Sequence, residues 1–298
     1  MLADPATPEP LRARLARVEE VRRFAAALGL AVGDQYTSYV PWPGDRVVTV
    51  VVRTRPGELE PAGFWFPLVG RVPYKGFFDP ERARAEAERL GREGYDVCEV
   101  GVRAYSTLGW LDDPVTGAML REGEGVLVET LLHELVHATA YLPDRARFNE
   151  GAATFLGQEA SVAFFLGAGL EPEAQARRRE VAARRRLDAA LGDLREAALR
   201  IYAAEPAGRR REGARATLEA GARERLRELL GPAAESVRLN DACLALSATY
   251  AADLEAYARA LAREGGDLRR FVALFRAAAA APDPLAALLG EGAPGPGS

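Results

Sequence analysis

Several residue types are scarce in this sequence, and each scarcity excludes a class of protein or site. Only two cysteines, Cys98 and Cys243, occur in 298 residues, so the chain can build neither a thiolate-only zinc site nor a dense disulfide framework. Both lie among apolar residues and far apart in the sequence. This placement predicts two separate, buried and unpaired thiols.

Long apolar runs and an excess of basic charge are also missing. No run reaches the roughly 18 residues that a membrane span needs, and residues 1–10 lack the features of a signal peptide. We therefore expect a soluble, cytoplasmic protein; removal of a leader would leave the same sequence, so a place in the cell envelope stays open. The net charge of -4 gives no reason to expect a nucleic-acid partner. The arginine cluster at 177–179 predicts a solvated helix face.

The apolar pattern changes along the chain. Before residue 125, helices are expected at 11–28 and 80–90 and strands at 46–52, 64–70 and 97–104, with Phe64, Trp65 and Phe66 in the core. After Gly125 almost everything favours helix. The predicted fold class is α+β, with a small N-terminal sheet with helices and a predominantly helical C-terminal half.

These patterns also predict the domain organisation. A flexible N-terminus (1–9) and a disordered tail (286–298) should flank a single catalytic unit at 10–285. Within that unit we expect an α+β lobe (10–125), a metal-binding helix pair (126–166) and a helical lobe (167–285).

The chain has only two histidines, His133 and His137, with Glu134 between them in the stretch LLHELVHATA. On a helix, residues four apart share one face, so both imidazoles can bind a single Zn2+ ion. Glu134 can then act as general base on a water at the metal. The alternative is that both histidines are core residues bonded to the backbone.

The stretch around these histidines is apolar nearly all round from Val126 to Tyr141, which predicts a buried helix. Leaving buried polar groups unpaired costs several kcal/mol, and a metal would satisfy both imidazoles. Glu150 lies in the stretch FNEGAATFLG, at the start of a following helix that should run antiparallel to the first. It is the candidate third ligand, although an acid near a helix N-terminus is also favourable without any metal. Thr154 and Glu129 are candidates for orienting the imidazole rings.

Four stretches carry a resemblance to a known family: 63–79 (GFWFPLVGRVPYKGFFD), 96–114 (DVCEVGVRAYSTLGWLDDP), 131–141 (LLHELVHATAY) and 148–157 (FNEGAATFLG). HELVH followed by NEG resembles the gluzincin pattern, in which the third zinc ligand is a glutamate on the next helix. Together the stretches are similar to the bacterial family of predicted zinc aminopeptidases. The resemblance implies a gluzincin-like fold, one Zn2+ held by His133, His137 and Glu150, and Glu134 as general base.

The tetrahedral oxyanion of peptide hydrolysis needs a second electrophile, and no histidine remains for it. Tyr105 is the preferred candidate, with Tyr74, Tyr202 and Tyr250 as alternatives. The gluzincin resemblance further implies a substrate-binding edge strand in AYSTLGW, formed by Ser106, Thr107, Leu108 and Gly109. Asp112, Asp113 and Glu129 are acids that could recognise a free amine, but the sequence does not separate exopeptidase from endopeptidase.

The expected activity is zinc-dependent peptidase, in the form of an aminopeptidase acting on a peptide or small amide. Three alternatives remain: a zinc-binding pseudo-enzyme that binds peptides without turnover, a zinc hydrolase of a non-peptide amide or ester, and a helical scaffold. The oligomeric state is not indicated.

Overall fold

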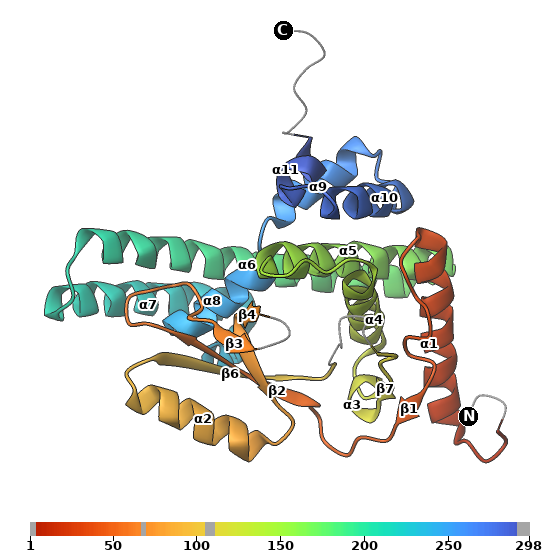
Figure 1. The fold of residues 1–298 in the computed structure, drawn as a ribbon, viewed down its shortest axis with the longest axis horizontal. Helices are drawn as coiled ribbons and strands as arrows, with labels where there is room; N and C mark the ends of the chain where they lie inside the picture. The colour runs from red at the N-terminus through yellow and green to blue at the C-terminus, as the bar shows by residue number, and fades with distance from the viewer. Residues whose placement is uncertain (1–3, 67–69, 105–110, 291–298) are drawn as a thin grey trace, which may run out of the picture. The chain divides into compact units, whose positions relative to one another are not determined.

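A computed structural model of the chain describes residues 4–66, 70–104 and 111–290 (Figure 1). It combines α-helices with small sheets, and most of it is helical, in agreement with the mixed fold expected. The chain forms two compact units whose segments alternate along the sequence. Unit 1 comprises Met1–Val47, Arg103–Arg179 and Ala252–Ser298, and unit 2 comprises Val48–Val102 and Glu180–Ala251. The expected lobes at 10–125, 126–166 and 167–285 stay predictions.

Unit 1 is almost entirely helical. Its elements are α1 (Glu9–Leu28), β1 (Tyr39–Val40), β7 (Val115–Thr116), α3 (Gly117–Leu120), α4 (Glu124–Thr139), α5 (Ala146–Gly167), α9 (Leu254–Arg263), α10 (Leu268–Ala279) and α11 (Pro284–Leu289). The long helix α6 (Glu171–Ala204) begins in this unit and ends in unit 2. Helix α4 packs against α1 and α5, and α5 packs also against α9.

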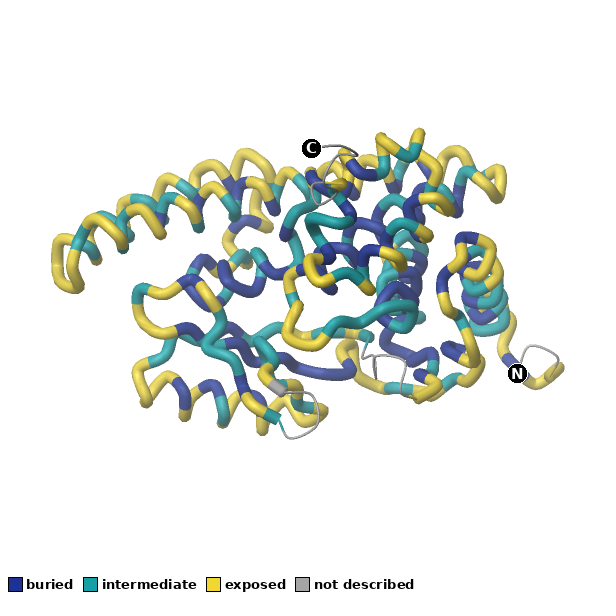
Figure 2. Tube along the Cα trace, turned by 45° about the horizontal axis from the view of Figure 1, so that its top comes forward, coloured by how far each residue is buried: buried dark blue, intermediate teal, exposed yellow. Residues whose placement is uncertain are grey.

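The core of unit 1 explains why α4 is apolar on nearly every side. Its four leucines are fully buried, whereas Val126 in its first turn is 40% exposed, and α5 contributes Phe155 and Phe165 to the same core. Buried stretches of the chain are dark blue in Figure 2. Polar residues on such a helix must therefore find partners within the protein.

Unit 2 contains a three-stranded antiparallel sheet in the order β5 (Tyr74–Phe77), β2 (Val48–Thr54), β6 (Asp96–Val102). Its other elements are β3 (Phe64–Phe66), β4 (Gly70–Val72), α2 (Pro80–Arg92), α7 (Arg209–Leu230), the 3-10 helix η1 (Gly231–Ser236) and α8 (Asp241–Tyr250). Val51 packs in a cluster with α2 and Val52 in a cluster with α8, so these helices cover opposite faces of the sheet. In β3 the same alternation buries Phe64 but leaves Trp65 68% exposed, so the expected core position of Trp65 was wrong.

Cys98 and Cys243 form a disulfide, so the prediction of two unpaired thiols was wrong. Cys98 lies on the face of β6 that α8 covers, and Cys243 lies in the first turn of α8. The strand and helix thus bring the two Cα atoms to 5.0 Å, within the range that a disulfide requires. Apolar neighbours in the sequence gave no indication of this pairing.

No described helix combines the length and the apolar composition needed to cross a membrane.

Candidate metal centre

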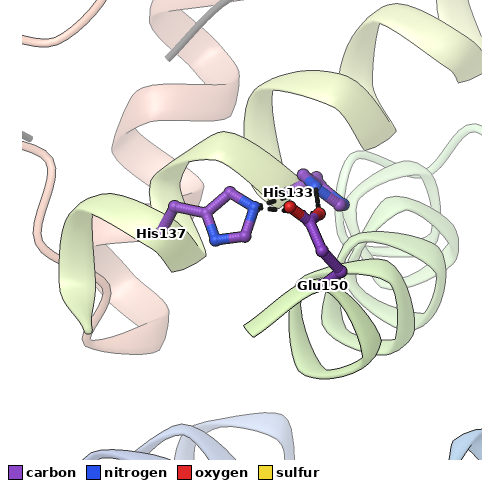
Figure 3. A group of neighbouring side chains, drawn as sticks. All are labelled: His133, His137 and Glu150. Atoms are coloured by element: carbon purple, nitrogen blue, oxygen red, sulfur yellow. Dashed lines mark hydrogen bonds and ion pairs between the residues drawn. The ribbon is translucent and has the colours of Figure 1, made fainter. Parts of the chain in front are cut away.

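Two neighbouring helices of unit 1 carry the three residues of the candidate site. His133 and His137 lie one turn apart on α4, and Glu150 lies in the second turn of α5. All three side chains point into the space between the helices (Figure 3). His137 and Glu150 are buried, and His133 is only slightly more accessible.

The turn between α4 and α5 fixes the direction in which Glu150 points. Asp144 adopts a positive φ of 60°, a conformation that aspartate tolerates well, and reverses the chain. Asn149, which is 2% exposed, donates its side-chain amide to the Leu142 carbonyl at 2.7 Å and accepts from the Leu142 N–H at 3.0 Å. This reciprocal pair ties the start of α5, one residue before Glu150, to the segment that follows α4. Sequence reasoning did not single out Asn149.

The separations among the three side chains fit one small metal ion. The two histidine Nε2 atoms are 3.1 Å apart, and Glu150 Oε2 lies 3.3 Å from His133 Nε2 and 3.4 Å from His137 Nε2. Bond lengths of about 2.0–2.2 Å around a tetrahedral ion place neighbouring ligand atoms about 3.3–3.6 Å apart. The buried group of two imidazoles and one carboxylate can therefore bind a metal ion.

The charges of the three side chains support one another. Burial raises the pKa of Glu150, but the facing histidines outweigh burial and bring that pKa to about 2. Burial lowers the pKa of His133, yet the hydrogen bond to Glu150 and the charges of Glu134 and Glu150 raise it above its usual value. In the metal-free site the Glu150 carboxylate therefore stabilises the protonated form of His133.

Glu134 follows His133 on α4 and is partly buried. Burial raises the pKa of its carboxyl group, the two histidines lower it, and Glu150 and Asp113 raise it further. A carboxyl group with a raised pKa accepts a proton more readily near neutral pH than an ordinary glutamate does.

Tyr36 and Asp113 lie on the Glu134 side of the site. The Tyr36 N–H donates to the Asp113 carbonyl at 2.7 Å, while the Gln35 side chain accepts from the Asp113 N–H at 2.9 Å and donates to the Leu111 carbonyl at 2.6 Å. Burial, then the charges of Glu134 and Asp113, raise the pKa of Tyr36 well above its usual range. Tyr36 also has a positive φ of 63°, which is rare for a bulky residue and costs roughly 1–3 kcal/mol.

Tyr141 is the second tyrosine that sequence reasoning missed. Its ring meets the His137 ring edge to face, with centroids 6.3 Å apart. Burial, followed by the charges of Glu150 and Asp144, raises its pKa. Its position four residues after His137 could have indicated this contact, whereas no sequence signal connects Tyr36 with a site about a hundred residues later.

Glu129 and Thr154 were predicted to orient the imidazole rings, and both lie close to the candidate ligands along their helices. Glu129 forms an ion pair with Arg177. Thr154 lies one turn beyond Glu150, with no hydrogen bond recorded within the described parts of the chain. His137 Nδ1 is buried and likewise has no partner among the described residues. Arg177 is only 6% exposed, so the prediction of a solvated face at 177–179 was wrong at this position.

The other candidates fall into three groups: residues of unit 2, residues that are not described, and Asp112. Tyr74, Tyr202 and Tyr250 belong to unit 2, where Tyr202 donates to Asp241 at 2.6 Å. Tyr105, Ser106, Thr107, Leu108 and Gly109 lie outside the described residues, and Asp112 has no recorded bond in the described part of the chain.

Comparison with known proteins places the chain in a family. Neither a search of curated proteins nor one of solved structures finds a match. A family model described as "Putative aminopeptidase" matches residues 1–286. The chain, with its helical pair carrying two histidines and a glutamate, therefore belongs to the family of that description.

Proposed function

We propose that this protein is a zinc-dependent aminopeptidase with a gluzincin-like fold. One observation carries the proposal: two imidazoles and one carboxylate from adjacent helices converge at separations of 3.1–3.4 Å, close to the roughly 3.3–3.6 Å between ligand atoms around one tetrahedral ion. Imidazole with a single carboxylate suits zinc, and three protein ligands leave one position open, as in catalytic rather than structural zinc sites. Membership of the family adds support for peptide substrates.

Different residues of the site would bind the metal and transfer the proton. Zn2+ held by His133, His137 and Glu150 would supply Lewis-acid chemistry, since it polarises a carbonyl and lowers the pKa of water to about 7. Glu134 accepts the proton of the attacking water and returns it to the leaving amine. The raised pKa of Glu134 suits both the uptake of the proton and its return.

A tyrosine hydroxyl is proposed as the second donor to the oxyanion. Tyr105 is the candidate from sequence, with the neighbouring residues Ser106–Gly109 as the substrate-binding strand. Tyr36 and Tyr141 are the described tyrosines whose pKa values respond to the carboxylates of the site. Individual replacements by phenylalanine should identify the donor by a loss of kcat with Zn2+ content unchanged.

The metal content of the purified protein tests the proposal. The wild type should contain one Zn2+ per chain, His133→Ala should contain much less, and the wild type should hydrolyse unblocked peptides and amino-acid amides. Hydrolysis of N-terminally blocked peptides would indicate an endopeptidase instead. Activity on non-peptide esters alone, or zinc without turnover, would favour the other hydrolase or the pseudo-enzyme. A wild type without metal would overturn the proposal.

A further inference from the structure

Helices α4 and α5 lie in close contact at Gly157, opposite Glu129 and His133. A methyl group placed on Gly157 of α5 would lie 3.1 Å from the Glu129 carbonyl oxygen and 3.3 Å from His133 Cβ. Contacts this short require the neighbouring helix to move by a few tenths of an ångström. Gly157 lies two turns after Glu150 on the same face of α5, so a movement that separates α4 from α5 here would also carry Glu150 away from the histidines.

The other side of α5 leaves it little freedom to move. A methyl group on Gly151 would lie 2.5 Å from the Ala252 carbonyl oxygen and 3.2 Å from the Tyr257 ring. Helix α5 is therefore held between α4 at Gly157 and the chain around Ala252 at Gly151.

A buried arginine bridges α4 and α5 next to this contact. Arg177, near the start of α6, donates through Nε to Ser161 Oγ at 3.0 Å and pairs through its terminal nitrogen with Glu129. Ser161 lies one turn after Gly157 on α5, and Glu129 lies one turn before His133 on α4. One guanidinium thus bonds both helices, and its fork of donors suits this bridge better than an ammonium would.

We propose that Gly157 and Arg177 are positioning residues, which hold α4 and α5 at the separation at which the three candidate ligands can bind one metal ion. The inference rests on the proposed metal site. Neither residue touches the metal or the substrate; each acts through the spacing of the helices. Replacement of residues that hydrogen-bond metal ligands directly typically lowers metal affinity about 10–100-fold, and we expect an effect at the lower end of that range here.

Competition with a chromogenic chelator measures the Zn2+ dissociation constant of each full-length variant. Gly157→Val should raise that constant about tenfold or more, and Gly157→Ala should raise it less. Gly167→Val is the matched control, because it lies at the end of the same helix and a methyl group there meets no atom within 4 Å. Its dissociation constant should equal that of the wild type. If Gly157→Val does not fold, the Zn2+ dissociation constant of Gly157→Ala tests the inference, and a value equal to that of the wild type would overturn it.

Arg177→Met, which keeps the apolar stem and removes the bridge, should weaken Zn2+ binding about tenfold or more. Arg178→Met is the control, since Arg178 is the exposed neighbour on the same helix. A merely structural role would lower the melting temperature of the metal-free protein and leave Zn2+ affinity unchanged, and that outcome would overturn the inference. A wild type that binds no Zn2+ would overturn the proposed function as well, so the two failures are distinguishable.

Discussion

The Nε2 atoms of His133 and His137 lie 3.1 Å apart on successive turns of α4. At this distance one ring can donate to the other only if the two are in different protonation or tautomeric states. Glu150 Oε2 lies within 3.4 Å of both rings and carries negative charge at neutral pH, since its pKa is about 2. One divalent cation would satisfy the three atoms at once, and the expected effects on Zn2+ binding and hydrolysis depend on that arrangement.

Glu134→Gln should lower kcat about 10²- to 10⁴-fold, because the amide cannot accept the proton of the attacking water. Zn2+ content should stay at the wild-type level, since Glu134 is not a proposed ligand. Hydrolysis of an amino-acid amide and metal analysis of the same preparation measure the two effects. Retained activity would remove Glu134 from the role of general base.

Zn2+ affinity should fall as pH is lowered from about 8 to about 6, because protons and metal compete for the His133 ring. The pKa of His133 is raised in the metal-free protein, so part of the population is protonated near neutral pH and must lose that proton on binding. Calorimetry in buffers of different ionisation enthalpy should therefore detect proton release with Zn2+. Affinity independent of pH over this range would contradict the assignment of His133.

Asn149→Ala should lower the free energy of unfolding by about 1–3 kcal/mol and weaken Zn2+ binding, because it frees the turn that orients Glu150. Chemical denaturation and chelator competition measure the two effects. Asn240→Ala is the matched control: Asn240 also makes two hydrogen bonds, to the Val97 carbonyl and the Cys243 N–H, but within unit 2. Asn240→Ala should lower the free energy of unfolding and leave the Zn2+ affinity unchanged. Equal Zn2+ affinities for both variants and the wild type would refute the orienting role.

The denatured protein should show no free thiols before reduction and two afterwards, because Cys98 and Cys243 are paired. The double variant Cys98→Ser, Cys243→Ser should be about 2–5 kcal/mol less stable, since the bond constrains a long loop of the unfolded chain. Thiol titration and thermal unfolding with and without reductant test this. Two reactive thiols in the unreduced, denatured protein would contradict the pairing.

The parts of the site that depend on local sequence spacing could be predicted, and those that depend on distant contacts could not. Two histidines four apart share a helix face whatever the rest of the chain does, and Glu150 follows after a short turn. Tyr36 comes near Glu134 through tertiary contacts: hydrogen bonds join the 33–36 turn to the 111–113 segment, and the Tyr36 side chain packs in the core that α4 also lines. Nothing local to either segment encodes that pairing.

The same distinction applies to the fold. The alternating apolar residues of 97–104 predicted a strand, and β6 is found there. Which helix covers each face of that strand depends on tertiary packing, so the pairing of Cys98 with Cys243 was not foreseen. Arg177 was misjudged for a related reason: its neighbours Arg178 and Arg179 are exposed, and its burial depends on partners on other helices, Ser161 and Glu129.

The disulfide between residues 98 and 243 closes a covalent ring that contains His133, His137 and Glu150. A protease that cuts the chain once anywhere inside this ring opens it without producing two separate molecules. Such a nicked protein would keep the full mass on a non-reducing gel, apart from one added water, and would separate into two fragments only after reduction.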